Sequence, residues 1–248
     1  MSSPDGSGRP RYDRDGLFSA LADETRREGL QITHEQSPTG LTKAELAAEL
    51  VSRTAVDTAA TVTDDDRQRA LVDCHHRLIP ALADADLITE FDDRIVATDH
   101  WAFDDAELMT VIAGQTTDYG TDLDALFEAL ADARRRTTIT VLEDRQQPLS
   151  VDTLAREITA SEATPSDGED PQDRIEQTLS TLTHVHLPIL HDSGLIGYDA
   201  PARRVSYEGH PMLHAGWLEE THERGSHADT RDRLPEPGPE LVRSGIER

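Results

Sequence analysis

The sequence predicts a mainly α-helical protein with short β-hairpins, in which one unit of three helices, a hairpin and a trailing helix occurs twice. The first observation is an internal repeat: Leu17–Arg27 reads LFSALADETRR, Leu126–Arg136 reads LFEALADARRR, and eight of the eleven positions are identical. The second is that apolar residues recur at helical spacing, ahead of paired β-prone segments, in both halves. The predicted organisation is a disordered arm over 1–14, copy 1 over 15–113, a linker over 114–123, copy 2 over 124–222 and a disordered tail over 223–248.

The composition is strongly acidic. The formal charge is −25, from 49 Asp and Glu against 24 Lys and Arg, and Lys43 is the one lysine. This balance resembles the proteins of extreme halophiles. Near 1 M salt the screening length falls to about 3 Å, so the self-repulsion of such a surface largely disappears. We therefore expect partial unfolding in dilute buffer; a full circular dichroism spectrum at low salt would contradict this.

Several protein classes are disfavoured by the sequence. The apolar runs are too short for a membrane span, and the first residues lack the apolar core of a signal peptide. The single Cys74 excludes an intramolecular disulfide and a Cys-rich zinc site. The periodic apolar segments argue against a largely disordered chain. We expect a soluble, cytoplasmic protein.

In copy 1, helix one is expected to start near Asp15 and to run past Leu30. Thr42 followed by Glu45 is the capping box of helix two, and residues 52–63 are expected to be a loop. Helix three starts at three acidic residues and carries an inward stripe: Leu71, Cys74, Leu78 and Leu82. The hairpin pairs residues 87–91 with 94–98, and a helix over 101–113 follows.

Copy 2 repeats this order at an offset of 108 or 109 residues. Helix one starts at Asp124 and extends to Val141, and Ser150 caps helix two. A loop is expected over 160–171. Helix three carries Ile175, Leu179, Leu182, Ile189 and Leu190, a hairpin pairs 195–198 with 204–207, and a final helix is expected over 211–222.

Three helices followed by a β-hairpin is the order of elements in a winged helix-turn-helix. Short motifs in both copies resemble the helix motifs of the arsenic-repressor-like (ArsR) regulators. The matching segments are Leu21–Glu28 for their first helix, Thr42–Ala47 for their second, and His76–Ile88 and His184–Ile196 for the end of their third. The whole is similar to tandem winged-helix domains of unknown function found in haloarchaea, over 15–98 and 124–208. The resemblance implies transcriptional regulation through DNA.

Two features depart from that pattern. The turn between helices two and three of a helix-turn-helix normally has three or four residues, whereas about a dozen are expected in each copy here. Each third helix also contains a proline, Pro80 or Pro188, which cannot bond the carbonyl of His76 or His184 four residues back. The sequence therefore predicts a kink at each proline.

The candidate DNA-reading surface is the outward face of the third helices together with the hairpin tips. Arg, Gln, Thr and His side chains there could reach base edges or phosphates. The candidates are Arg67, Arg69, His76, Arg77, Arg94, Arg174, Gln177, Thr181, His184, Arg203 and Arg204. The alternative is that these are ordinary solvated positions, since DNA-binding proteins generally carry a basic stripe and Asp64–Asp66 would face phosphate.

Other clusters favour structure over chemistry. The arginines at the end of each repeat are expected to form ion pairs with neighbouring carboxylates such as Glu24 and Glu28. Cys74-His75-His76, His184-Val185-His186 and the pair His210 and His214 do not supply three or four converging zinc ligands. No nucleophile–base pair or phosphate loop is present, so we expect neither a metal, nor a cofactor, nor an enzyme.

The expected function is that of a DNA-binding transcriptional regulator of a halophilic archaeon, with double-stranded DNA as partner. The alternative is a non-catalytic protein-interaction or assembly module on the same scaffold. The trailing helices hold Trp101 and Trp217, which suit either packing on their own domain or an interface. A homodimer and an intrachain pseudo-dimer of the two copies both remain open.

Overall fold

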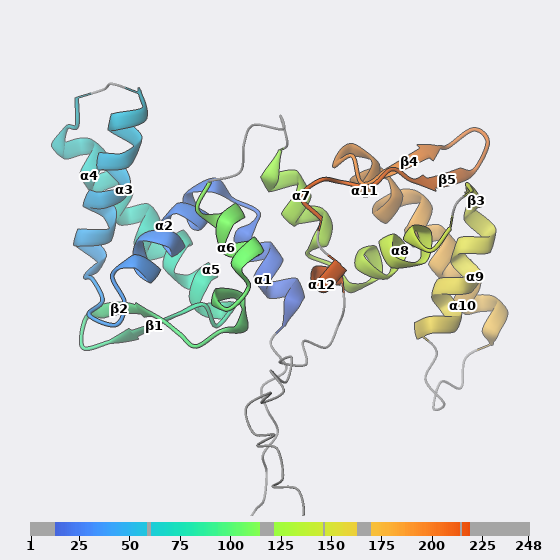
Figure 1. Ribbon diagram of the computed structural model, residues 1–248, viewed down its shortest axis with the longest axis horizontal. Helices are drawn as coiled ribbons and strands as arrows, with labels where there is room; N and C mark the ends of the chain where they lie inside the picture. The colour runs from blue at the N-terminus through green and yellow to red at the C-terminus, as the bar shows by residue number, and fades with distance from the viewer. Residues whose placement is uncertain are drawn as a thin grey trace, which may run out of the picture.

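Two helical lobes, one for each repeat, lie side by side with α1, α7 and α12 between them (Figure 1). The computed structural model describes residues 13–58, 61–114, 122–145, 147–162, 170–213 and 215–218. The predicted tail and most of the predicted arm and linker lie outside these residues. Within them, no helix has the length and apolar character needed to cross a membrane.

Copy 1 follows the predicted order with additional breaks. Its elements are α1 (Arg14–Leu21), α2 (Glu24–Glu35), α3 (Lys43–Thr58), α4 (Asp64–Asp73), the π-helical turn η1 (Cys74–Leu78), α5 (Ile79–Asp84), β1 (Ile88–Phe91), β2 (Arg94–Ala97), the 3₁₀ turn η2 (Trp101–Phe103) and α6 (Ala106–Ile112).

Copy 2 repeats this order up to its last helix. Its elements are α7 (Leu123–Leu130), α8 (Ala133–Glu143), β3 (Leu149–Ser150), α9 (Val151–Glu162), α10 (Pro171–Thr181), the π-helical turn η3 (Leu182–His186), α11 (Leu187–Asp192), β4 (Ile196–Asp199), β5 (Arg204–Tyr207) and α12 (Ala215–Leu218). The trailing helix predicted over 211–222 is thus described only as α12, and residues 214 and 219–222 lie outside the described chain.

The predicted helix one is wrong as a single helix, because a break divides the repeated motif in both copies. Asp23 is extended, with φ −155° and ψ 124°, and its carboxylate accepts the N–H of Arg26 at 2.9 Å. Asp132 does the same for Arg135 at 3.0 Å. An aspartate in this conformation is an N-cap, so α2 and α8 begin anew after it.

Helix two is longer than predicted in copy 1. The capping box is confirmed: Glu45 Oε2 accepts the N–H of Thr42 at 2.7 Å, and Thr42 Oγ1 accepts that of Glu45 at 3.2 Å. The expected loop was wrong for residues 52–58, which continue α3 to Thr58. In copy 2 Ser150 Oγ accepts the N–H of Thr153 at 3.1 Å, as expected of a cap, and α9 runs to Glu162.

Each third helix contains a π-helical turn directly before its proline. Ile79 donates its N–H to the carbonyl of Cys74, five residues back, and Leu187 donates likewise to Leu182. Because Pro80 has no N–H, the regular ladder is interrupted at this place. The structure thus has a π turn next to each proline at which a kink was predicted, within a helical path that continues on both sides.

The two predicted hairpins are confirmed, and the second is part of a three-stranded sheet. β1 pairs antiparallel with β2, and β4 with β5. The additional strand β3 pairs with β5, and in copy 1 a single bridge between Leu41 and Ile95 occupies the matching place. This third pairing was not predicted, because β3 spans only two residues.

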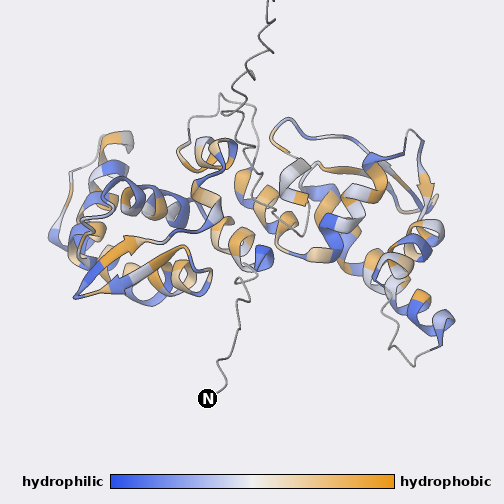
Figure 2. Ribbon diagram, turned by 60° about the horizontal axis from the view of Figure 1, so that its bottom comes forward, coloured by the Kyte–Doolittle hydropathy of each residue, from blue (hydrophilic) through white to orange (hydrophobic). Residues whose placement is uncertain are grey.

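The core is continuous through both lobes. Apolar segments gather where the lobes meet as well as inside each (Figure 2). Leu17, Phe18, Leu126 and Phe127 are fully buried, as is Trp217. The repeated motif therefore belongs to the centre of the molecule.

Because His100 is buried, we expect the protein to lose stability in mild acid. Burial lowers its pKa to about 4, while its Nδ1 accepts the N–H of Ala102 at 3.1 Å. The unfolded chain binds a proton near pH 6.5 and the folded chain does not, so stability is full above pH 6.5 and falls as the pH drops toward 4. By linkage the loss reaches about 2 kcal/mol at pH 5.

The variant His100→Asn keeps a cap acceptor but does not titrate in this range. Urea unfolding at pH 7 and pH 5 in molar KCl should show a smaller pH dependence for the variant than for the parent chain. An equal dependence would assign the acid sensitivity to other groups.

Candidate nucleic-acid interface

The two copies meet through the first helix of each. The rings of Phe18 on α1 and Phe127 on α7 stack with their centroids 6.1 Å apart. These residues are 109 positions apart and so hold the same place in the repeat. A contact between equivalent residues is the mark of a two-fold interface.

Crossed ion pairs repeat this symmetry. Arg27 Nη1 lies 2.6 Å from Asp124 Oδ1 in copy 2, and Arg136 Nη1 lies 2.6 Å from Asp15 Oδ1 in copy 1. Both pairs are again related by 109 positions.

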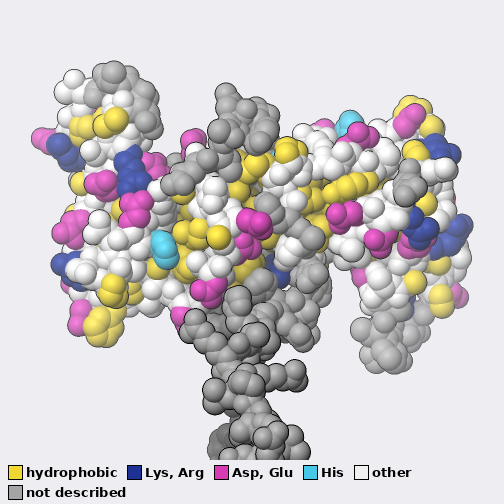
Figure 3. Space-filling view, viewed as in Figure 1, with side chains coloured by type: hydrophobic (Ala, Val, Ile, Leu, Met, Phe, Trp, Pro, Cys, Tyr) yellow, Lys and Arg dark blue, Asp and Glu magenta, His cyan; other side chains and the backbone are white. Residues whose placement is uncertain are grey.

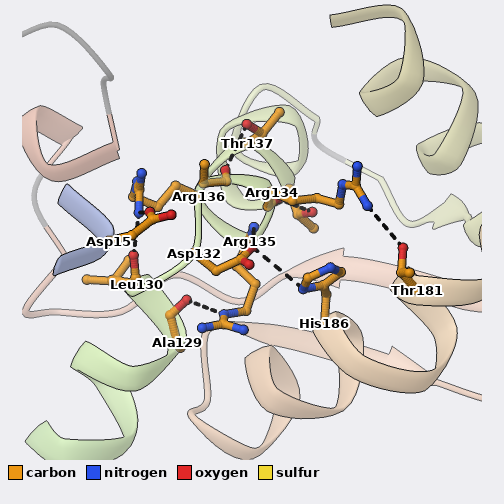
Figure 4. Close-up of polar contacts among 12 residues, drawn as sticks. Asp15, Ala129, Leu130, Asp132, Arg134, Arg135, Arg136, Thr137, Thr181 and His186 are labelled. Carbon is orange, nitrogen blue, oxygen red and sulfur yellow. Dashed lines mark hydrogen bonds and ion pairs between the residues drawn. The ribbon is translucent and has the colours of Figure 1, made fainter. Parts of the chain in front are cut away.

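Each of these two guanidinium groups also hydrogen-bonds the last carbonyl of the preceding helix. Arg27 donates to the carbonyl of Leu21 at 2.6 Å and Arg136 to that of Leu130 at 2.7 Å, both buried. Figure 4 shows Arg136 reaching Asp15 and Leu130 together. Each of these arginines therefore binds both the end of the preceding helix in its own copy and a carboxylate of the other copy.

The prediction that the paired arginines bind carboxylates near them in sequence is confirmed for Arg26 but wrong for Arg27 and Arg136. Arg27 and Arg136 bind carboxylates of the other copy, and Arg26 lies nearest Asp23, at 3.8 Å. α1 packs chiefly against α7 and also contacts α5, the end of the third helix of its own copy. Sequence neighbours were a poor guide because the repeat forms a contact with itself.

One end of the interface departs from the symmetry. Trp217 on α12 is fully buried against Phe18 and Phe127, and its Nε1 donates to Asp105 Oδ2 of copy 1 at 3.1 Å. Arg14 Nη1 donates to the carbonyl of Gly216 at 2.7 Å. The trailing segment of copy 2 is therefore part of the junction between the copies.

In copy 1 the predicted contact residues of the third helix lie at its surface. Arg67 pairs with Asp64 at 2.8 Å, and Arg69 pairs with Asp66 at 3.0 Å. Both arginines project into solvent beside the acidic first turn of α4. His76 and Arg77 are also exposed, and neither forms a hydrogen bond or an ion pair within the described chain.

In copy 2 the corresponding positions are less available. Arg174 is half-buried and lies 3.4 Å from the carbonyl of Thr159. Thr181 accepts a hydrogen bond from Arg134 at 3.1 Å. Gln177 and His184 are exposed. The two third helices therefore offer different side chains to any ligand.

The hairpin arginines are held by the protein itself. Arg94 donates to the carbonyl of Gly40 at 2.7 Å and Arg204 to that of Pro148 at 2.8 Å. Arg203 lies 3.3 Å from Asp152. These bonds position the tips, and a phosphate would have to compete with Asp152 for Arg203.

Charges of both signs alternate on the candidate surface. On the face in Figure 3, Lys and Arg side chains occur in separate groups beside Asp and Glu, without a continuous basic stripe. The two hydrogen bonds that Thr63 gives Asp66 lower the pKa of that carboxyl, so the first turn of α4 keeps its negative charge. Nucleic acid would meet this charge directly at low salt.

The histidine and cysteine clusters do not converge into a metal site among the described residues. Cys74 is 1 % exposed, and burial raises the pKa of its thiol to about 11. Burial also lowers the pKa of His186, whose Nδ1 lies 3.6 Å from Asp132, beyond hydrogen-bond length. The Cys74 thiol is therefore neutral at physiological pH, and Cys74 belongs to the inward stripe of the third helix.

Comparison with family models gives two matches, both to a domain of unknown function, DUF7344, over residues 18–97 and 127–206. The two matches coincide with the two lobes and exclude the trailing segments. Searches of curated proteins and of solved structures find no match.

Proposed function

We propose that this chain, which carries two DUF7344 domains and belongs to that family, is a DNA-binding transcriptional regulator in which two winged helix-turn-helix units form a dimer within one chain. The observation that carries this is the pseudo-two-fold contact between α1 and α7. Helix-turn-helix proteins commonly bind two half-sites through two-fold symmetry, and the crossed Arg–Asp pairs supply that symmetry without a second chain.

The element order supports a winged helix. In each copy a short first helix and then three further helices, the last of which contains the π turn, are followed by a hairpin. β3 adds the short extra strand that makes one hairpin part of a three-stranded sheet. The long turn expected between helices two and three is reduced in copy 1, where residues 59–63 separate α3 from α4. The geometry of copy 1 is thus nearer to a helix-turn-helix than the sequence suggested.

The surface chemistry suits binding in concentrated salt. The acidic composition and near-absence of lysine support a halophilic origin in an archaeal cytoplasm. Screening near 1 M salt reduces the repulsion between Asp64–Asp66 and phosphate. In copy 1 the exposed His76 and Arg77 remain available for base or phosphate contact.

The test is recovery of genomic DNA fragments by the tagged full-length chain in molar KCl. We expect enrichment of specific fragments, weakened about tenfold by Arg77→Ala through the loss of a charged hydrogen bond. Arg69→Ala and the double variant Arg203→Ala/Arg204→Ala should also weaken it. The control is Arg145→Ala, which removes an exposed arginine paired with Glu157 outside the third helices and hairpins.

A second candidate is a protein-interaction module. The observation that favours it is the placement of exposed apolar side chains: Val72 and Val185 lie on the third helices and Phe91, 70 % exposed, lies on the first hairpin. Apolar contacts of this kind suit a protein partner. Absence of DNA enrichment, or enrichment indifferent to the arginine variants, would favour this candidate over DNA binding.

A further inference from the structure

A cavity of about 700 Å³ opens in copy 1 between the start of α2, α3 and the third helix. Its floor is apolar, formed by Leu50, Val51, Ala70, Cys74 and Leu78. The Cys74 thiol there is neutral and buried. A cavity of this size is within the usual range of small-molecule sites.

Charged groups stand at the cavity mouth. Arg77 is exposed and unpaired within the described chain, and Arg26 approaches only Asp23, at 3.8 Å. The carboxylate of Asp73 is likewise exposed and without a hydrogen-bond or ion-pair partner there. Asp23 and Asp66, in contrast, are engaged as helix caps. The mouth therefore offers free groups of both signs beside an apolar floor.

In copy 2 the side chains at the equivalent positions are bonded to one another. Arg134 binds both carboxylate oxygens of Glu162, at 2.8 and 2.7 Å. It also donates to Thr181 at 3.1 Å (Figure 4). Beneath them Thr159 donates to Thr178 at 3.0 Å in the interior. These bonds tie α8, α9 and α10 together where copy 1 is open.

The repeat shows which substitutions create the cavity. The positions of Arg134 and Glu162 are held in copy 1 by the short Thr25 and Thr54. The two free charges are also peculiar to copy 1, since Asp73 corresponds to Thr181 and Arg77 to Val185. The copies therefore differ both in the side chains at these positions and in the charges at the cavity mouth.

We propose that the copy 1 cavity binds a small organic zwitterion with an apolar body, such as an aromatic amino acid. The apolar body lies on the floor, the carboxylate faces Arg26 and Arg77, and the ammonium group faces Asp73. A carboxylate between two guanidinium groups receives charge-assisted hydrogen bonds. The proposal does not depend on DNA binding.

The probes are three molecules that share a benzene ring and differ in charge: L-phenylalanine, phenylacetate and phenethylamine. Equilibrium dialysis against the full chain in molar KCl should show one L-phenylalanine bound per chain. Phenylacetate and phenethylamine should each bind about tenfold more weakly, because each lacks one charged contact. Equal binding of either one, or no binding of L-phenylalanine, would overturn the proposal.

Two variants take their residues from copy 2. Asp73→Thr/Arg77→Val alters exposed positions only and should weaken L-phenylalanine binding about tenfold or more. Thr25→Arg/Thr54→Glu should close the cavity and abolish binding, with circular dichroism confirming the fold. Arg145→Ala is the control and should bind as the parent chain does. Binding unchanged in Asp73→Thr/Arg77→Val would place the probe elsewhere and refute the site.

Discussion

Replacing Arg136 by Ala is expected to lower the free energy of unfolding by about 2–4 kcal/mol. Its side chain is 5 % exposed, and it binds both Asp15 of copy 1 and the carbonyl of Leu130. Its guanidinium carbon also lies 5.9 Å from the ring centre of Phe18. Truncation removes all three contacts and leaves a buried carbonyl without its donor. Urea unfolding in molar KCl, followed by circular dichroism, measures the change.

The matched control is Arg145→Ala. Arg145 also forms an ion pair, with Glu157 at 2.9 Å, but it is half exposed, so its loss should cost no more than about 1 kcal/mol. By the symmetry of the interface, Arg27→Ala should resemble Arg136→Ala. A loss at Arg136 no greater than at Arg145 would show that the crossed pairs do not hold the copies together.

The sequence predicted the repeat unit well because its signals are local. Capping residues, the stripe of the third helix and the β-prone pairs each depend on residues a few positions apart. The break at Asp23 was missed, although an aspartate followed by a helical segment is a readable N-cap signal. The continuous pattern of apolar residues across Leu17 to Leu30 concealed it. The extension of α3 to Thr58 was missed because residues 52–58 are small and polar, with little periodicity.

The candidate surface could be located from sequence but its chemistry could not. The order of elements is enough to identify the third helices and the hairpin tips. Whether an arginine there is free depends on acceptors distant in sequence, such as Gly40 for Arg94 and Pro148 for Arg204. The crossed ion pair between Arg27 and Asp124 joins residues 97 positions apart, which no local pattern reveals.

Symmetry and divergence therefore lie in different parts of this molecule. The residues that meet across the α1–α7 contact, such as Phe18 and Phe127, are the same in both repeats, as an interface between equivalent faces requires. The residues around the copy 1 cavity differ between the repeats. A duplicated chain can keep a two-fold arrangement while one copy changes its interior, because the differing positions 25, 54, 73 and 77 lie outside α1 and α7.

Replacing Trp217 by Ala is expected to produce the largest loss of stability, about 3–5 kcal/mol. Trp217 is fully buried and packs on Phe18 and Phe127. Its indole N–H donates a hydrogen bond to Asp105. Its removal leaves a cavity at the junction and takes from Asp105 the contact that links α12 to α6. Because the junction couples the lobes, we also expect the urea transition to broaden or divide into two steps.

The control for Trp217→Ala is Phe91→Ala, which removes an aromatic ring that is 70 % exposed and should change the unfolding free energy by less than about 0.5 kcal/mol. Circular dichroism and tryptophan fluorescence should report the same transition for the parent chain and for Phe91→Ala. In Trp217→Ala the remaining Trp101, on copy 1, should report the unfolding of its own lobe. A single unshifted transition in Trp217→Ala would mean that α12 does not stabilise the junction, and that the α1–α7 contact alone holds the two copies together.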